Sequence, residues 1–420
     1  MERMRDRKQI RYSLMFFLFL TAYTLTVPCR FSLPAVSEAL YAFHVVDFSA
    51  GFCSKLLPGA VFRFFVKNPT IEAACAFDCM LLLLFFLGTA LLLGVRAKTF
   101  LDASGNRGML FLFFFLCGPA TFSVYASEPG FVDFYWLLFG LLFLLFLPRR
   151  STLFFLLPLP ALCVLTHFSA MLCAVPFFVI LLLYRFGECA DGKERALVAL
   201  VGTASIALAL ALFFYLLLHE KSNLVYSMEE FDRILQSRGV KVTSYFDYVF
   251  YDGGETVRRV AQSGYAPMTA VGGGLFEKAF AAVKNQFLWN VALLDKAGWR
   301  ILPGRAALLL LISPVVGLLF VFIRRRVRAE TVKTKKLALS LSPMLFFLTL
   351  ICGMLFSTDY SRWIALAVLP AFTFVLYVCF RETQFAAEYL RDVFTRVPRS
   401  WQTVYAVVYA LTVIPPTDWA

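Results

Sequence analysis

The stretch Met80-Leu-Leu-Leu-Leu-Phe-Phe-Leu-Gly-Thr-Ala-Leu-Leu-Leu-Gly-Val95 contains no charged side chain and decides the fold class. A helix needs about 20 mainly apolar residues to cross about 30 Å of hydrocarbon. Similarly apolar runs recur at residues 109 to 117, 131 to 147 and 306 to 323. They do not alternate polar with apolar residues as barrel strands do, so their backbone groups must pair within helices. The sequence therefore predicts an all-α, polytopic integral membrane bundle.

The overall composition leads to the same class. The chain is 60% hydrophobic and only 16% charged, whereas soluble domains are about 45 to 50% apolar and about 25% charged. Its net charge of +13 comes from short basic clusters between the apolar runs, and not from one basic face, so we expect no nucleic acid partner. Residues 1 to 11 are basic and an apolar run follows without a convincing cleavage site, which indicates an uncleaved first span.

The positive-inside rule gives the topology. We expect about eleven spans, or between ten and twelve, at residues 13–29, 73–95, 108–126, 131–148, 152–166, 168–185, 197–218, 306–323, 337–356, 363–380 and 401–415. The basic loops and the N-terminus then lie in the cytoplasm, as in a multi-pass protein of the bacterial cytoplasmic (inner) membrane. Residues 152 to 185 could instead form one long span with an interfacial piece, and the last segment is short.

A single membrane domain, residues 1–420, would carry two larger segments on its outer side: a first outer loop, 30–72, and an inserted outer segment, 219–305. Apolar residues recur in the second at steps of three and four, at Phe276, Phe280, Val283, Phe287, Val291 and Leu294. This spacing predicts an amphipathic helix on the membrane surface or over a cavity. The mixture of aromatic rings and carboxylates over residues 245 to 255 would suit sugar stacking, or equally the membrane interface.

Several kinds of chemistry leave no signature in the sequence. Gly272 to Gly274 lack the Gly-Lys-Ser/Thr ending of a phosphate loop, and neither a serine nucleophile elbow nor an H-E-x-x-H helix occurs. The ten cysteines show no paired C-x-x-C spacing. Of these only Cys29 and Cys53 share an outer loop, where they could pair. We identify no cofactor and no metal ligands, although a divalent cation could supply positive charge to a site.

The first outer loop holds the strongest candidate residues, in His44-Val-Val-Asp47-Phe-Ser-Ala-Gly51-Phe-Cys-Ser-Lys55-Leu-Leu-Pro-Gly59. If this stretch is helical, Asp47, Gly51 and Lys55 lie on one face, which places an acid and a base beside a residue without a side chain. Such a face suits a pocket. The alternative is that Asp47 and Lys55 are solvated charges on an interfacial helix.

Isolated polar residues at other membrane boundaries face the same predicted side. We identify His167 as the only histidine within the apolar bulk, where a polar ring is costly unless it faces a cavity or a partner. An inter-helix hydrogen bond would also explain it. Arg362 could bind phosphate through its two-pronged donor geometry. Asp359 would pair with it, or simply favour a helix start. Asp78 should lie within the membrane.

Together these residues carry a resemblance. The spacing Asp47-x3-Gly51-Phe52-x2-Lys55-x-Leu57-x-Gly59, His167 ahead of a span with Pro176, and Asp359-x-x-Arg362-Trp363 resemble poorly characterised bacterial multi-span membrane proteins of surface polysaccharide loci. Lys55 departs from that pattern, in which the basic residue is often Arg. The resemblance implies a role in envelope glycan synthesis.

A more distant similarity is to integral-membrane glycosyltransferases that use polyprenyl-phosphate sugars. In those proteins an acidic residue of the first outer loop is the catalytic base, which implies Asp47 here, or else Glu38. The Asp-Glu or Glu-x-Asp pairing that is common in them is absent from this loop.

We therefore predict a membrane glycosyltransferase or polysaccharide polymerase that uses lipid-linked sugars at the extracytoplasmic face in cell-envelope glycan synthesis. Such chemistry needs a base for the acceptor hydroxyl and cations for the leaving phosphate. Asp47 is the expected catalytic base, and the substrate-binding residues are Lys55, His167, Asp359 and Arg362. The expected partners are the lipid-linked sugar and membrane lipids. The alternatives are a transporter or flippase that uses Asp78, His167 and Asp359, or a non-catalytic envelope assembly scaffold.

Overall fold

The fold is described from a computed structural model. It describes residues 2–32, 34, 36–121, 123–126, 130–219, 222–241, 243–251, 253, 264–266, 271–297, 301–356 and 360–412. Over these residues all the regular elements are helices, and the β-type pairing is an isolated antiparallel bridge between Gly51 and Leu224. The predicted all-α class is therefore confirmed.

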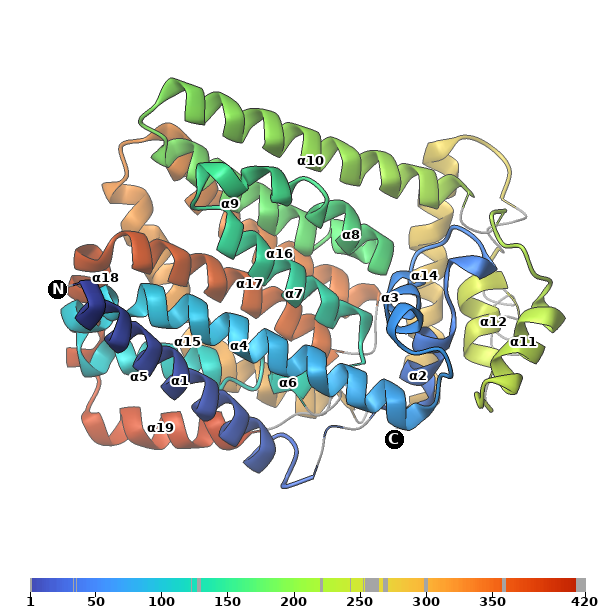
Figure 1. Cartoon of the computed structure of the whole chain (residues 1–420), viewed down its shortest axis with the longest axis horizontal. Coiled ribbons are helices and arrows are strands. Elements are labelled where there is room, and N and C mark those ends of the chain that lie inside the picture. The colour runs from blue at the N-terminus through green and yellow to red at the C-terminus, as the bar shows by residue number, and fades with distance from the viewer. Residues whose placement is uncertain are drawn as a thin grey trace.

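The helices of the described residues follow one another along the chain in the order given below (Figure 1). Their bounds are α1 (Glu2–Thr26), α2 (Glu38–Val45), η1 (Phe48–Ala50), α3 (Leu57–Phe65), α4 (Ile71–Ser104), α5 (Asn106–Leu116), α6 (Ser123–Ala126), α7 (Val132–Phe146), η2 (Arg150–Leu156), α8 (Leu159–Thr166), η3 (Phe168–Met171), α9 (Ala174–Glu188), α10 (Gly192–His219), α11 (Met228–Ser237), α12 (Ser244–Tyr251), α14 (Leu275–Ala297), α15 (Ile301–Ala329), α16 (Lys333–Phe356), α17 (Tyr360–Arg381), α18 (Thr383–Thr395) and α19 (Arg399–Leu411).

Six helical segments of the described chain are long and apolar enough to cross a membrane: Ile71–Ser104, Ser169–Glu188, Gly192–His219, Leu302–Ala329, Lys333–Leu355 and Tyr360–Arg381. Shorter apolar helices cover Asn106–Leu116, Val132–Phe146 and Arg150–Thr166. A multi-pass membrane protein fits these lengths. The expected number of about eleven spans is not confirmed by them and stays a prediction.

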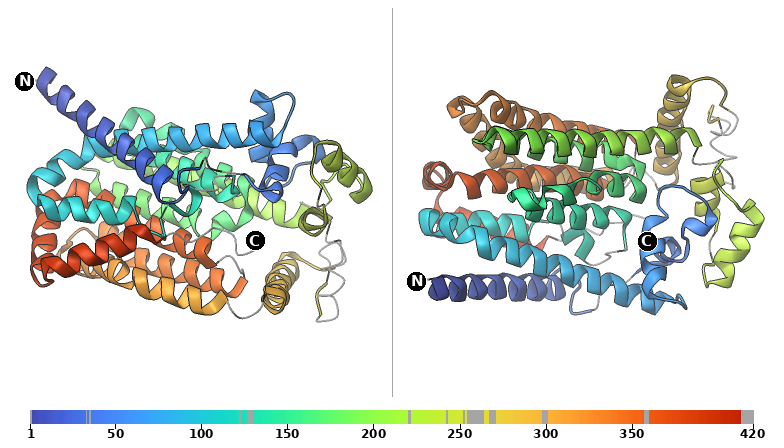
Figure 2. Two further views of the ribbon diagram at one scale, coloured as in Figure 1. Left: turned by 90° about the horizontal axis from the view of Figure 1, so that it is seen from below. Right: turned by 45° about the horizontal axis from the view of Figure 1, so that its top comes forward.

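Helix α17 occupies the centre of the bundle, where it contacts α4, α9, α15, α16 and α18 (Figures 1 and 2). Most of its residues are buried. By contrast α10 lies at the edge and exposes apolar side chains such as Leu200 and Leu208. A helix that is apolar all round suits either a protein interior or a lipid environment, so the pattern is that of a bundle whose outer face meets lipid.

The two ends of the bundle differ in composition. Helices α2, α3, α11, α12 and α14 gather at one end, which we call the cap (Figure 1). The connections between α9 and α10 and between α15 and α16 lie at the opposite end together with α18. We call this the basic end because it carries clusters such as Arg324, Arg325, Arg326 and Arg328.

The amphipathic helix predicted from residue 276 onward is present as α14. It crosses the ends of the bundle steeply (Figures 1 and 2) and is fastened to α16 by Asn290, whose Nδ2 donates to the Leu355 carbonyl at 2.9 Å. Its apolar stripe faces outward, with Phe276 81% exposed and Phe280 65% exposed. The helix and its outward apolar stripe are thus confirmed, whereas its position on a membrane surface or over a cavity stays a prediction.

The first outer loop is not one continuous helix, so the predicted shared face of Asp47, Gly51 and Lys55 is wrong. Helix α2 ends at Val45, and Asp47 caps the short η1. Gly51 then adopts φ +136°, and a Cβ there would lie 2.3 Å from the Asn223 carbonyl oxygen. Lys55 also has a positive φ of 69°. The close pairing of this loop with residues 223 to 225 overrides helical continuity.

Two further expectations about the outer segments are resolved. Cys29 and Cys53 are both buried free thiols and do not pair, and the Cys29 Sγ donates instead to the Ala126 carbonyl. Phe246 and Phe250 of α12 are buried in the cap, where they cannot stack on a sugar. Residues 252, 254 and 255 of the same aromatic stretch lie outside the described residues.

Candidate functional site

His167 lies where α8 ends and η3 begins, between Thr166 and Phe168. Its Nδ1 accepts the Ser169 backbone N–H at 3.1 Å, which caps η3. The imidazole is half-buried and meets the Trp136 indole edge-on, with 6.3 Å between the ring centroids. A histidine at this break between two apolar helices is therefore held by local hydrogen bonds and by one aromatic neighbour.

Arg362 occupies the first turn of α17 and faces the start of α7. Its Nε lies 2.7 Å from Oδ2 of Asp133, whose side chain is only 3% exposed. The guanidinium also sits over the Phe131 ring, 4.9 Å from the centroid. Asp133 lies in the first turn of α7, where the helix dipole stabilises a charged carboxylate. The ion pair with this carboxylate holds Arg362 at the cap side of the bundle.

Lys55 completes the group from the first outer loop. Its backbone N–H donates to the Leu165 carbonyl at 2.9 Å, which ties the loop to the end of α8. The charges of Lys55 and Arg362 both act on His167. Burial and then these two cations hold the pKa of His167 well below its ordinary value. Lys55 and Arg362 with the neutral His167, which we call the cation cluster, thus lie near enough for their charges to act on the imidazole, although they are far apart in the sequence.

Asp47, the expected base, has other partners. Its side chain accepts the Ser49 N–H at 2.8 Å and forms an ion pair with Arg63. Burial acts to raise the pKa of Asp47, but the hydrogen bonds from Ser49 and the charges of Arg63 and Arg238 outweigh it and hold the pKa below its ordinary value. None of these partners belongs to the cation cluster. Asp359, the remaining predicted residue, lies outside the described residues.

No protein-family model matches this chain, and neither a curated protein nor a solved structure shows significant similarity to it. The resemblance to proteins of polysaccharide loci thus stays a prediction from the sequence.

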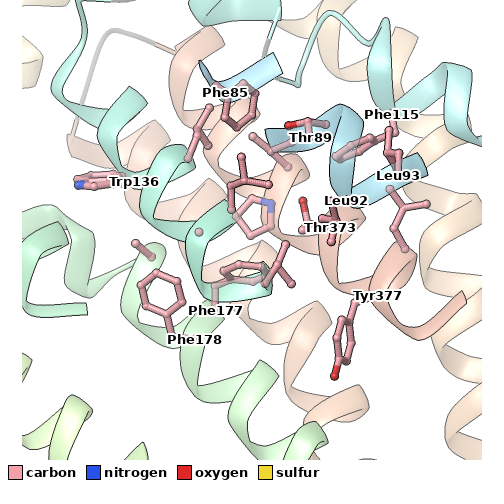
Figure 3. Close-up of a pocket in the computed structure, with 18 of the residues that line it drawn as sticks. Phe85, Thr89, Leu92, Leu93, Phe115, Trp136, Phe177, Phe178, Thr373 and Tyr377 are labelled. Atoms are coloured by element: carbon pink, nitrogen blue, oxygen red, sulfur yellow. The ribbon is translucent and has the colours of Figure 1, made fainter. Parts of the chain in front are cut away.

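A cavity begins beside the cation cluster and runs toward the basic end between α4, α7, α9 and α17 (Figure 3). Its volume is about 120 Å³, or about 1100 Å³ when all the empty space open to the surroundings is counted, and its lining is mainly apolar. Trp136 and Cys173 line the end next to the cluster. Trp136 touches His167, and the charge of Arg362 acts on Cys173. Arg96 and Arg381 line the other end.

The structure also contains a polar pair that sequence reasoning missed. His44 of α2 and Asp78 of α4 are both fully buried, with Nε2 and Oδ1 3.0 Å apart. The other ring nitrogen, Nδ1, lies 2.9 Å from the Leu40 carbonyl. His167 is therefore not the only histidine in the apolar interior, and that prediction was wrong. Asp78 was expected within the membrane, and the need of such an acid for a partner was the signal that could have found His44.

The pair with Asp78 decides the charge of His44. Burial acts to lower the pKa of His44, but the hydrogen bond and the charge of Asp78 outweigh it and hold the pKa above its ordinary value. A charged His44 under the cap neutralises the carboxylate of a helix that spans the bundle. The pair thus joins α2 of the cap to α4.

A second carboxylate site lies inside the cap. Asp247 of α12 is 8% exposed and shares a hydrogen bond with Asp232 of α11. Burial, this hydrogen bond and the charges of Asp232 and Glu229 raise the pKa of Asp247 to about 7. Two adjacent carboxyl groups that share one proton produce such a shift.

Among the described residues, no three His, Cys, Asp or Glu side chains gather as metal ligands.

The raised pKa of Asp247 predicts that stability falls as pH rises. Between about pH 4 and about pH 7 the folded carboxyl keeps a proton that the unfolded chain releases, so the free energy of unfolding decreases across this window. The thermal unfolding midpoint of the purified protein should be lower at about pH 8 than at about pH 5. Asp247→Asn should flatten this dependence, whereas Asp102→Asn on the exposed surface of α4 should leave it unchanged.

Proposed function

We propose that this protein is a multi-pass membrane glycosyltransferase or polysaccharide polymerase that takes lipid-linked sugars at the cap side of the bundle. The observation that carries the proposal is that the charges of Lys55 and Arg362 both act on His167 at that end, beside an apolar interior. In this proposal the cap faces the extracytoplasmic side of a bacterial inner membrane. The N-terminus lies in the cytoplasm, and about eleven spans cross the bilayer.

The chemistry of glycosyl transfer from a lipid phosphate explains the residue types. Negative charge builds up on the leaving phosphate oxygen, and preorganised cations in a site that excludes water stabilise that charge. Lys55 and Arg362 would be these cations, and Asp133 holds Arg362 in place. His167 stays neutral beside these two charges, so its ring can donate a hydrogen bond to a phosphate oxygen. An amphiphilic substrate naturally presents its phosphate at this membrane boundary.

Asp47 keeps the role of base in the proposal, with one condition. General base catalysis requires a carboxylate within hydrogen-bond reach of the acceptor hydroxyl. Asp47 is ionised but is engaged by Arg63 and by the Ser49 N–H. An acceptor sugar would have to take the place of one of these partners. Asp47 lies in the same outer loop as Lys55, eight residues earlier in the chain.

Removing the charge of Lys55 should abolish most of the activity without unfolding the protein. The side chain is half-exposed, and the tie to Leu165 uses only the backbone N–H. We expect Lys55→Gln to lower sugar transfer by about 10²-fold, the usual effect of losing one donor to developing negative charge. Lys55→Arg should keep much of the sugar transfer, because the positive charge remains. The measurement is transfer of labelled sugar in membranes of the producing cells, together with surface glycan and protein abundance.

The matched control is Lys67→Gln, which removes an exposed lysine from the same loop and should have no effect. Asp47→Asn is assayed alongside. Lost transfer at normal abundance supports Asp47 as the base, and normal transfer removes that assignment. If Lys55→Gln also transfers sugar normally, the cation cluster is not a phosphate site and the proposal is wrong.

Transport is the second candidate function, and the His44–Asp78 pair favours it. Ionisable residues within spanning helices commonly mark ion or proton pathways, and Asp78 lies in α4, which is long enough to span. A transporter would move an envelope precursor across vesicles that contain the purified protein, without changing its covalent structure. A glycosyltransferase would instead lengthen or transfer the glycan in the same vesicles.

A further inference from the structure

The cavity between α4, α7, α9 and α17 has the shape and lining of a site for a hydrocarbon chain. Phe85, Phe177 and Phe178 line it, together with Thr89, Thr373 and Tyr377 (Figure 3), and the Tyr377 hydroxyl donates to Glu188. Its lining on α4 extends from Phe85 to Arg96, roughly 16 Å at about 1.5 Å per helical residue. An extended acyl chain has a length of this order, and it is apolar like the side chains that line the cavity.

The end of the cavity at the basic end is strongly positive. Arg96 and Arg381 line it, and the charges of Arg381 and Arg149 both act on Arg96. The carboxylate close to them is Glu188, which pairs with Arg381 at 2.7 Å. Among the described residues the Arg96 side chain has neither an ion pair nor a hydrogen bond. Like charges held together at a partly buried position are unfavourable unless an anion binds between them.

An apolar lining next to arginines of which one, Arg96, has no ion-pair partner within the described chain distinguishes between kinds of ligand. A free phosphate would bind the arginines but leave the cavity empty. A neutral lipid would fill the cavity but would not pair with the arginines. An anionic phospholipid uses both, because its phosphate forms charge-assisted hydrogen bonds with guanidinium groups while one chain enters the cavity. Negatively charged lipids are also attracted to basic clusters at the membrane surface.

We propose that this cavity binds an anionic phospholipid, with the head group at Arg96, Arg149 and Arg381 and one acyl chain extended toward Trp136. The head group lies at the opposite end of the bundle from the cation cluster. The end of the chain lies under Trp136, which contacts His167. A bound chain would therefore pack against Trp136 on the side away from His167 and help to hold the cation cluster in position. The proposal does not depend on the reaction that takes place there.

Trp136 provides a direct readout of chain occupancy. The purified full-length protein is placed in phosphatidylcholine vesicles that contain a minor fraction of phosphatidylglycerol brominated in the terminal half of its chains. Quenching assigned to Trp136 is the difference between the wild type and Trp136→Phe. We expect brominated phosphatidylglycerol to quench this component more strongly than brominated phosphatidylcholine at the same fraction.

Matched variants test the two halves of the site separately. Arg96→Gln should weaken the preference for phosphatidylglycerol about five-fold, the worth of one basic residue near an anionic lipid surface. Arg399→Gln, at an exposed position of the basic end, should not change it. Gly140→Leu should abolish the quenching because a Cβ at Gly140 has room, 3.9 Å from the nearest Phe177 atom, and the larger side chain fills the cavity. Gly317→Leu, with open space around its Cβ, should leave the quenching intact.

Three results would overturn the proposal. Equal quenching by both lipids would remove the role of the arginines. Unchanged quenching in Gly140→Leu, with this variant correctly folded by its thermal midpoint, would show that the chain lies outside the cavity. Loss of the lipid preference on adding inorganic phosphate at constant ionic strength would show that the arginines hold a soluble anion and not a lipid head group.

Discussion

Replacing Asp78 by alanine is expected to lower the free energy of unfolding by about 3 to 5 kcal/mol, the usual cost of removing one partner from a buried ion pair. Asp78 and His44 are both 0% exposed. His44 has a raised pKa and would remain as a buried cation or be forced to lose its proton. The loss also removes the polar link between α2 and α4, so the cap should detach from the bundle more readily.

The measurement is the thermal midpoint in detergent at a fixed heating rate and at about pH 6, where the raised pKa keeps His44 charged in the wild type. A fixed rate is needed because large proteins often unfold irreversibly. The double variant Asp78→Leu with His44→Phe should recover most of the loss, since two apolar groups need no partner. Equal midpoints for the wild type and Asp78→Ala would show that the pair contributes nothing to stability.

How far the sequence predicts this structure depends on whether a feature is local. Apolar runs such as residues 80 to 95 predict α4 because each helix in lipid must satisfy its own backbone groups. The stripe from Phe276 to Val291 likewise predicts α14, because it repeats at the helical period. Both signals lie within one segment of chain. They need no knowledge of the other segments.

The candidate site could be predicted only in part, for the opposite reason. Lys55, His167 and Arg362 each stand out as polar residues at apolar boundaries. That they meet depends on the bond from the Lys55 N–H to Leu165 and on the Asp133–Arg362 pair, which join segments far apart in the chain. The position of Asp47 beside Arg63 depends on how the loop turns at Gly51. No spacing in the sequence gives that turn, because it is fixed by the contact with Asn223.

The second large effect is expected for Gly59→Ala, because Gly59 lies where α3 presses on α2. A Cβ at this position would fall 1.6 Å from the Val46 carbonyl oxygen and 2.7 Å from that of Phe43. Both atoms are backbone, so no side-chain rotation can relieve the clash. Overpacking ordinarily costs about 1 to 3 kcal/mol, and we expect the loss of unfolding free energy to be at the upper end of this range or beyond it.

This substitution should act on the cap in particular. Helix α2 carries His44, and Phe62 of α3 packs edge-on against that imidazole with 5.3 Å between the ring centroids. Pushing α3 away therefore disturbs the His44–Asp78 pair and the turn at Asp47 together. Gly317→Ala in α15, with open space around its Cβ, should be neutral or slightly stabilising because alanine favours a helix over glycine. If both variants show the same thermal midpoint, α2 and α3 are not in the close contact described, and the cap does not hold Asp47 and His44 through it.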